Sequence, residues 1–235
     1  MGEDIKRKIL LKAFNLMMVN DMNIIMMGPP GAGKGTYSSR LSEEHGIPHI
    51  ETGDIFRNEV EEGSELGKEI EGYMEKGDLV PDETVNDVVE KRLSKADCDD
   101  GYILDGYPRT MDQAKALLDF ASIDLVLNID ISKEVIVNRL SNRRICSECG
   151  EIYNLESLTP EEEGICDECG GELYQRDDDK PEVIENRLDE YESKSKPILE
   201  FYEDKVDLVN VVFDGETSVE NAIDKIKSKV NEFTK

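Results

Sequence analysis

The sequence predicts an α/β protein of three layers, in which a five-stranded parallel sheet lies between helices on both faces. Short apolar segments alternate with longer segments whose apolar residues recur at helical spacing, and strands joined through helices run parallel. A glycine-rich loop connects the first apolar segment to the helix that follows it. The 235 residues suffice for one such domain with insertions.

The expected elements follow from the apolar runs and their breaks. The strands are the segments 23–27, 47–50, 101–105, 125–130 and 208–213. The helices cover 37–45, 54–76, 82–93, 112–120, 133–143, 181–203 and 219–233. Glycines interrupt the segment 54–76, Pro81 marks the start of the next helix, and Pro197 is expected to bend the helix 181–203.

Residues 28–36 read GPPGAGKGT and predict a phosphate-binding loop. Glycines let the backbone N–H groups point inward at a helix N-terminus, which makes a nest that suits a polyphosphate. Lys34 can reach the β- and γ-phosphates, and a hydroxyl can serve Mg²⁺. The general pattern has Ser or Thr directly after the lysine, whereas here Gly35 intervenes and Thr36 follows. The alternative is a turn that binds nothing, and the order strand, loop, lysine, helix argues against it.

The charge of the chain excludes two classes of partner. Asp and Glu number 54 against 28 Lys and Arg, which gives a net charge of −26 spread along the whole sequence. Nucleic acids and membrane surfaces require a basic face, so neither is an expected partner. A uniformly acidic surface is typical of proteins adapted to high salt, although such surfaces usually lack lysine and 18 of the 28 basic residues here are lysines. No apolar stretch approaches the ~18 residues of a membrane span.

Residues 1–21 differ from the rest and form an N-terminal extension. Their apolar residues recur at helical spacing and are accompanied by Lys6, Arg7, Lys8 and Lys12. A signal peptide and an amphipathic surface helix are both alternatives. The apolar part is short and no small-residue cleavage site follows it. We therefore expect an extension, or an upstream start codon, before a domain that begins near Met22.

Two CxxCG motifs, with 16 residues between Cys149 and Cys166, predict a zinc site whose ligands are Cys146, Cys149, Cys166 and Cys169. Each motif turns two thiolates toward one point, and the spacing lies within the range of zinc sites. Two disulfides or a redox pair are the alternatives. The lack of a convincing signal peptide and the leftover Cys98 favour a cytoplasmic protein, in which disulfides are rare. Four protein ligands leave no open position, so we expect one structural zinc ion.

Most of the few arginines lie beside these motifs. Seven of ten do so, namely Arg57, Arg109, Arg139, Arg143, Arg144, Arg176 and Arg187. One such arginine would be weak evidence, because arginine is common on surfaces. Together they predict a cationic cleft within an acidic shell, since arginine binds phosphate through paired hydrogen bonds. Asp105 ends a strand, in the position of the carboxylate that serves Mg²⁺ in phosphate-loop proteins.

Six motifs in order show that residues 22–235 resemble the adenylate kinases, in the long form with a zinc-bearing lid. The motifs are GPPGAGKGT at 28–36, TGDIFR at 52–57, LVPDE at 79–83, LDGYPRT at 104–110, NRLSNRRICSECG at 138–150 and CDECGGELYQRDDD at 166–179. The resemblance implies a P-loop NTPase-type core with two inserts, an AMP-binding flap at 51–80 and a zinc lid at 142–179. Tyr107, Asn142 and the extension 1–21 depart from the commonest pattern.

The same resemblance implies a reaction. Members of the family transfer a phosphoryl group between MgATP and AMP to give two ADP, which serves adenine nucleotide homeostasis. The acceptor oxygen is already an anion, so no general base is required and catalysis rests on alignment and neutralised charge. We expect a monomer that uses Mg²⁺ with ATP and one structural Zn²⁺.

The resemblance also implies roles for individual residues. Catalysis would depend on Lys34, Arg109, Arg143, Arg176 and Arg187. ATP would bind to Gly31, Ala32, Gly33, Lys34, Gly35, Thr36, Arg139 and Arg143. AMP would bind to Thr52, Arg57, Leu79, Val80, Gly106, Arg109 and Gln113. Asp105 and Asp54 would hold Mg²⁺ through water.

Two other functions stay open at this point. A kinase for another nucleoside monophosphate would share these motifs, and the acceptor pocket around Thr52 and Gln113 decides between the two. A zinc-ribbon adaptor with a degenerate nucleotide site is an alternative outside the enzymes. Such an adaptor would lack part of the arginine set, and none of that set is missing here.

Overall fold

The computed structural model describes residues 22–213, 217 and 219–233, so the predicted extension 1–21 lies outside the described residues. The central sheet has five strands in the order β2-β3-β1-β4-β8, and every neighbouring pair is parallel. This confirms the predicted sheet. The strands are β1 (Met22–Met27), β2 (His49–Glu51), β3 (Gly101–Asp105), β4 (Leu125–Asp130) and β8 (Asp207–Val212).

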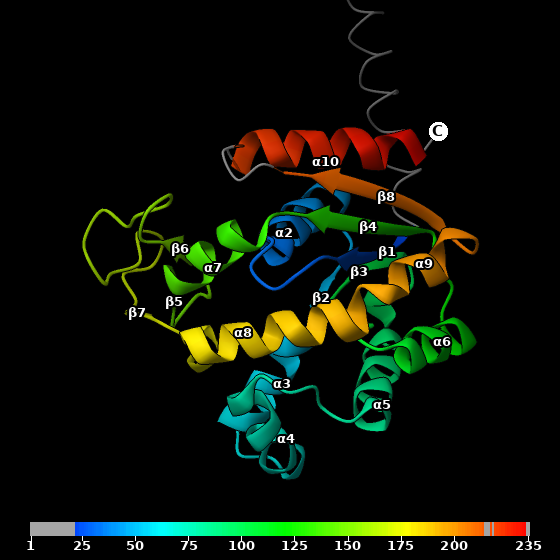
Figure 1. The fold of residues 1–235 in the computed structure, drawn as a ribbon, viewed down its shortest axis with the longest axis horizontal. Helices are drawn as coiled ribbons and strands as arrows, with labels where there is room; N and C mark the ends of the chain where they lie inside the picture. The colour runs from blue at the N-terminus through cyan, green and yellow to red at the C-terminus, as the bar shows by residue number, and fades with distance from the viewer. Residues whose placement is uncertain (1–21, 214–216, 218, 234–235) are drawn as a thin grey trace, which may run out of the picture.

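Helices cover both faces of this sheet (Figure 1). They are α2 (Lys34–His45), α3 (Thr52–Glu61), α4 (Glu65–Lys76), α5 (Asp82–Leu93), α6 (Met111–Phe120), α7 (Lys133–Ser141), α8 (Pro181–Glu190), α9 (Pro197–Glu203) and α10 (Val219–Phe233). On one face α2, α7, α8 and α10 enclose a core with Ile24 and Met26 of β1. On the other face α3, α4, α5, α6 and α9 enclose a second core with Ile25 and Met27. A strand that is buried on both faces reads as a continuous apolar run, which explains the sequence of β1.

Several element boundaries differ from those expected from the sequence. The first helix begins at Lys34, because Gly33 takes a left-handed conformation and starts it directly after the loop. The segment 54–76 is two helices, and the Ser64 side chain caps the second by accepting a hydrogen bond from the Gly67 N–H. The helix at 133 ends at Ser141, because Arg143 begins a strand.

The long helix expected at 181–203 is divided near Pro197, as predicted. Residues Tyr191–Ser195 form a π-helical turn between α8 and α9, and Pro197 is the first residue of α9. Proline lacks the N–H that a continuous helix would need, so the regular hydrogen-bond pattern is interrupted there. Short 3₁₀ turns lie at Ala96–Cys98 and Asp177–Asp179.

Two inserts project from this core. The helical insert, residues 52–76, consists of α3 and α4. The cysteine insert, residues 143–174, contains the antiparallel strands β5 (Arg143–Cys146), β6 (Ile152–Asn154) and β7 (Leu173–Tyr174). Figure 1 shows that the arrowheads of β4 and β8 point toward the side of the molecule that carries the cysteine insert. The carboxyl ends of the parallel strands, where α/β proteins bind ligands, therefore face the inserts.

Candidate active site

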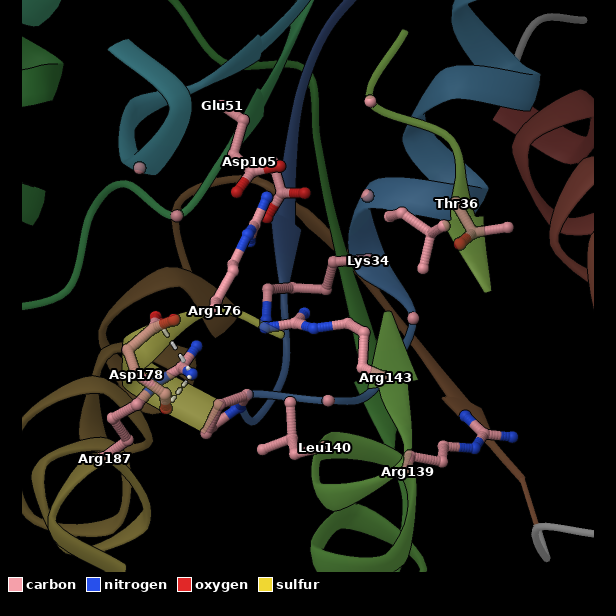
Figure 2. Close-up of a pocket in the computed structure, with 18 of the residues that line it drawn as sticks. Lys34, Thr36, Glu51, Asp105, Arg139, Leu140, Arg143, Arg176, Asp178 and Arg187 are labelled. Atoms are coloured by element: carbon pink, nitrogen blue, oxygen red, sulfur yellow. Dashed lines mark hydrogen bonds and ion pairs between the residues drawn. The ribbon is translucent and has the colours of Figure 1, made fainter. Parts of the chain in front are cut away.

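A cleft of about 1380 Å³ lies at the carboxyl ends of the parallel strands and is bordered by both inserts (Figure 2). Apart from Ala32 and Asp54, all the predicted nucleotide and magnesium residues line it. They are Gly31, Gly33, Lys34, Gly35, Thr36, Thr52, Arg57, Leu79, Val80, Asp105, Gly106, Arg109, Gln113, Arg139, Arg143, Arg176 and Arg187. The fold thus joins motifs that are as far apart in sequence as residues 31 and 187.

The glycine-rich loop connects β1 to α2 and approaches β4 closely. A Cβ atom at Gly28, whose φ is 138°, would lie 2.6 Å from the carbonyl oxygen of Ile129, so only glycine fits there. Lys34 Nζ donates hydrogen bonds of 2.9 Å to the carbonyls of Gly28 and Pro29. Burial lowers the pKa of Lys34 to about 8, against the opposing charge of Asp105. The loop therefore offers a helix N-terminus and a buried amine to one anion.

The predicted acceptor residues Thr52, Arg57 and Arg109 lie near one another in this cleft. Arg109 Nε donates to the Gly106 carbonyl at 2.7 Å, and the buried hydroxyl of Thr52 donates to the same carbonyl at 2.9 Å. Arg57 Nη2 donates to Glu51 Oε1 at 2.8 Å and also contacts Asp54. Burial lowers the pKa of Arg109, although Asp105 opposes this shift. Two guanidinium groups are thus held at one end of the cleft, where an anion can replace their present partners.

The amide of Gln113 is engaged by the protein itself. Its Oε1 accepts a hydrogen bond of 2.7 Å from the Arg109 N–H, and its Nε2 donates to Asp82 Oδ1 at 2.7 Å. Thr110 Oγ1 donates to the second oxygen of Asp82 at 2.8 Å. Gln113 can contact a base only by exchanging one of these partners.

The arginines near the cysteine insert are held by carboxylates. Arg143 donates from Nε and Nη2 to the two oxygens of buried Asp179, at 2.7 and 2.6 Å. Arg187 Nη1 contacts Asp178 Oδ2 at 3.1 Å and Asp179 Oδ1 at 3.2 Å. Figure 2 shows Arg187 beside Asp178, Arg143 extending toward Lys34, Arg176 pointing toward Glu51 and Asp105, and Arg139 directed away from them. Sequence reasoning missed both aspartates, although a run of three acidic residues directly after Arg176 could have indicated them.

Arg176 connects the two sides of the cleft. Its Nη2 lies 3.3 Å from Asp54 Oδ1 of the helical insert, whereas its buried Nε has no hydrogen-bond partner among the described residues. Asp54 is 53% exposed and also pairs with Arg57. The predicted magnesium residue Asp54 therefore faces two arginines and does not line the cleft.

A second polar group that sequence reasoning missed surrounds Asp105. His49 Nε2 lies 3.4 Å from Asp105 Oδ2, and His49, Glu51 and Asp105 each place one ligand atom within 4.8 Å of the others. Burial opposes ionisation of Glu51, but the charges of Arg57 and Arg176 outweigh it and lower the pKa of Glu51 to about 2. The signal was present in the sequence, because His49 and Glu51 alternate along the strand that leads into Thr52.

The four cysteines of the CxxCG motifs converge within the cysteine insert. Their Sγ atoms lie within 4.8 Å of one another, with Cys146–Cys169 at 3.4 Å and Cys149–Cys166 at 3.6 Å. Zn–S bonds of about 2.3 Å in a tetrahedron give an S–S edge of about 3.8 Å, so the group fits one zinc ion. Cys98 is buried in a different part of the chain, beside Arg92 at 3.1 Å.

The two motifs close in the same way. The N–H of Gly150 donates to the Cys146 carbonyl at 3.1 Å, and the N–H of Gly170 donates to the Cys166 carbonyl at 2.9 Å. Both glycines have φ of 76°, a left-handed conformation that glycine adopts readily. Such matched turns direct the thiols of both motifs toward one point.

Comparison with known proteins agrees with this geometry. The family model "Adenylate kinase" matches residues 26–207. The chain is 49% identical over 210 residues to an adenylate kinase of Thermosipho melanesiensis. The aligned residues cover 87% of this chain and 97% of that relative. It is 48% identical over 214 residues to an adenylate kinase of Methanococcoides burtonii, covering 89% and 96%. It is 50% identical over 195 residues to one of Syntrophomonas wolfei, covering 81% and 91%. Among the described residues, no helix is long and apolar enough to cross a membrane.

Proposed function

The chain belongs to the adenylate kinase family and transfers a phosphoryl group between ATP and AMP to give two ADP, and on this premise we propose how its residues share the reaction. One observation carries the assignment of roles. The phosphate loop and all six arginines that were predicted to bind the nucleotides line a single cleft. The AMP phosphate oxygen is already anionic, so these residues need to align two phosphates and neutralise their charge rather than remove a proton.

We assign the donor phosphates to the loop. The N–H groups at the start of α2, from Gly31 to Thr36, and the Lys34 amine would hold them, after Lys34 exchanges its two carbonyl partners for phosphate oxygens. Arg139 would lie against the adenine. The remaining donor contacts would come from Arg143, Arg176 and Arg187, whose carboxylate partners show that each guanidinium can hold an anion.

We assign the acceptor phosphate to Arg57 and Arg109, which line the same cleft as the loop. The adenine of AMP would lie among Thr52, Leu79, Val80, Gly106 and Gln113. Gln113 would then exchange Asp82 or the Arg109 N–H for the base, since both ends of its amide are occupied. In this arrangement Arg109 faces the transferring group, because it also lies near Asp105 and Lys34.

Mg²⁺ is assigned to Asp105, which is buried at the end of β3 and lies in the same cleft as Thr36. A bound Mg²⁺ would neutralise charge on the donor phosphates. Carboxylate oxygens are the ligands that this ion prefers, and Asp105 offers them next to the loop. Asp54, for which the resemblance implies the same role, does not line the cleft, and we do not assign the ion to it.

We propose that the four thiols of Cys146, Cys149, Cys166 and Cys169 hold one structural zinc ion. The Sγ distances fit a tetrahedral ion, and no ligand position is left for a substrate. A bound ion would add folding free energy to a segment with few apolar residues.

The two inserts are proposed to move during the reaction. The helical insert, within residues 51–80, would close on AMP, and the cysteine insert, within residues 142–179, would close on ATP as a lid. Closure excludes water, which limits hydrolysis of ATP. A monomeric state, a cytoplasmic location and a lack of nucleic-acid partners, all expected from the sequence, stay predictions.

A coupled assay of ADP formation tests the proposed function. ATP with AMP should give rapid turnover that requires Mg²⁺, whereas CMP, UMP and GMP as acceptors should be at least ten times slower. An equal or faster rate with another monophosphate would assign the chain a different acceptor. An absence of turnover with all four acceptors would favour an adaptor with a degenerate nucleotide site.

A further inference from the structure

We propose that Glu51 is a second carboxylate of the magnesium site, and that Arg57 releases it for this role when the acceptor phosphate binds. The inference rests on the proposed function, because it takes Arg57 as a ligand of the AMP phosphate and Asp105 as the carboxylate that serves Mg²⁺. It gives the role that the resemblance implied for Asp54 to a residue directly beside Asp105.

The backbone places Glu51 and Asp105 side by side. They are partners in the parallel pairing of β2 and β3, and each is the last residue of its strand. A Cβ atom at Gly35 would lie 3.5 Å from Glu51 Oε2 and 3.9 Å from Asp105 Oδ2. Both carboxylates therefore face the phosphate loop at one point, and Figure 2 shows them adjacent.

The carboxylate oxygens at this point accept few hydrogen bonds, which suits the binding of a divalent cation. Glu51 Oε1 accepts a hydrogen bond from Arg57, but within the part of the chain that the structure describes Oε2 accepts none. Asp105 Oδ2 contacts only the ring of His49 among these residues, at 3.4 Å. Two carboxylates at this separation repel each other, and a divalent cation between them removes that repulsion. Oxygen ligands of this kind favour Mg²⁺ and Mn²⁺ over softer ions.

Glu51 also lies between the two substrate sites. One of its oxygens holds Arg57 at 2.8 Å, and the other faces Gly35 of the loop. An AMP phosphate that binds Arg57 competes with Glu51 for this guanidinium. When the phosphate displaces it, Glu51 loses the nearer of the two guanidinium groups that act on it, since only Arg176 stays, and the affinity of this point for a cation rises. Linkage requires the reverse as well, so the cation must raise the affinity for AMP by the same factor.

Asp54 provides a matched control. It carries the same charge and contacts the same Arg57, but it is half exposed, turns toward Arg176 and does not line the cleft. Asp54→Asn removes one negative charge next to Arg57 without removing an oxygen that faces Asp105. A general effect of charge on metal binding would therefore appear in both variants, and a ligand effect only in Glu51→Gln.

The experiment measures Mn²⁺ binding to the full zinc-loaded chain by the electron paramagnetic resonance signal of free Mn²⁺, without ATP. We expect AMP to raise the Mn²⁺ affinity of the wild type about fivefold or more, after subtraction of the Mn²⁺ that AMP binds in a protein-free titration. Glu51→Gln should lower the Mn²⁺ affinity about tenfold or more and remove the effect of AMP. Asp54→Asn should stay within about twofold of the wild type. Arg57→Gln should bind Mn²⁺ more tightly than the wild type and show no effect of AMP.

Three results would overturn the inference. One is a Glu51→Gln variant, folded by its circular dichroism, with the Mn²⁺ affinity of the wild type. Another is an equal loss of affinity in Asp54→Asn, which would show a charge effect alone. The third is a wild type that binds AMP without any change in Mn²⁺ affinity. Failure of the proposed function appears separately, as a wild type that forms no ADP, because Mn²⁺ binding without ATP requires no turnover.

Discussion

The helical insert and the cysteine insert border the same cleft but are held to the protein in different ways. In the helical insert, Phe56 of α3 and Ile70 of α4 are buried in the core beneath the central sheet, together with Val85 and Leu104 of the main domain. In the cysteine insert, Cys146, Tyr153 and Cys166 form a separate small cluster, against which only Leu173 packs. The helical insert therefore shares the core of the main domain, whereas the cysteine insert has only a small cluster of its own.

This difference teaches what each insert requires. A segment of about 30 residues cannot bury enough apolar surface to fold by itself, so it needs either a shared core or a covalent or metal crosslink. The helical insert uses the shared core, and the four thiols of the cysteine insert offer the crosslink. We therefore expect loss of zinc to affect one insert alone.

The largest effect on activity is expected at Arg109. This residue belongs to neither insert, so the effects of changes in the two inserts can both be compared with it. Arg109→Ala removes a guanidinium that lines the cleft and is assigned to the transferring phosphoryl group, so kcat/KM should fall about 100-fold or more. The thermal midpoint and the zinc content should stay near those of the wild type. Steady-state kinetics with ATP and AMP check this, and activity within a few-fold of the wild type would remove Arg109 from the site.

The next effect concerns the thiols. Cys149→Ser should reduce zinc from about one per chain, loosen the cysteine insert and lower the melting temperature, because metal binding here is folding free energy. Activity should fall but stay measurable, since no cysteine takes part in the chemistry. Cys98→Ser, outside the cluster, is the control and should keep the zinc. Elemental analysis measures the zinc content and calorimetry the melting temperature. A full zinc content in Cys149→Ser would contradict the proposed zinc site.

A smaller effect is expected where α3 crosses α4. A Cβ atom at Gly67 would lie 2.0 Å from the Glu59 carbonyl oxygen, whereas Gly72, on the same helix, has open space around it. Gly67→Ala should therefore lower the free energy of unfolding by about 1–3 kcal/mol and raise the KM for AMP. Gly72→Ala should be neutral or stabilising by up to about 1 kcal/mol. Equal denaturation midpoints for the two variants would contradict the close packing of this insert.

The smallest effect is expected for the ion pair between the helical insert and Arg176, which lies just after the cysteine insert. Asp54 is 53% exposed and lies 3.3 Å from Arg176, so solvent screens the pair. Asp54→Asn should change the free energy of unfolding by less than about 1 kcal/mol, and added salt should reduce even that change. Urea denaturation at low and high salt measures it. A loss of several kcal/mol would mean that the inserts depend on each other for stability.

The sequence predicted those parts of the protein that local patterns determine. The strands β1, β3 and β4 are largely apolar because both their faces are buried, and GPPGAGKGT and the CxxCG motifs each lie within one short segment. Partners brought together by the fold could not be predicted. The pairing of Arg143 with Asp179 joins residues that are 36 positions apart. Glu51 lies beside Asp105 because the register of β2 and β3 pairs these two residues. Helix ends such as Ser141 were missed, because the following strand decides where the helix stops.

Hydrogen exchange measured by mass spectrometry, with and without zinc, tests the contrast between the inserts most directly. Exchange reports local opening, segment by segment, in the folded protein. After zinc is removed with a chelator, exchange should accelerate strongly in residues 143–174, while residues 52–76 and the five strands of the sheet keep the rates of the zinc-loaded protein. Equal acceleration in both inserts, or none in residues 143–174, would contradict the account that a metal holds one insert and a shared apolar core holds the other.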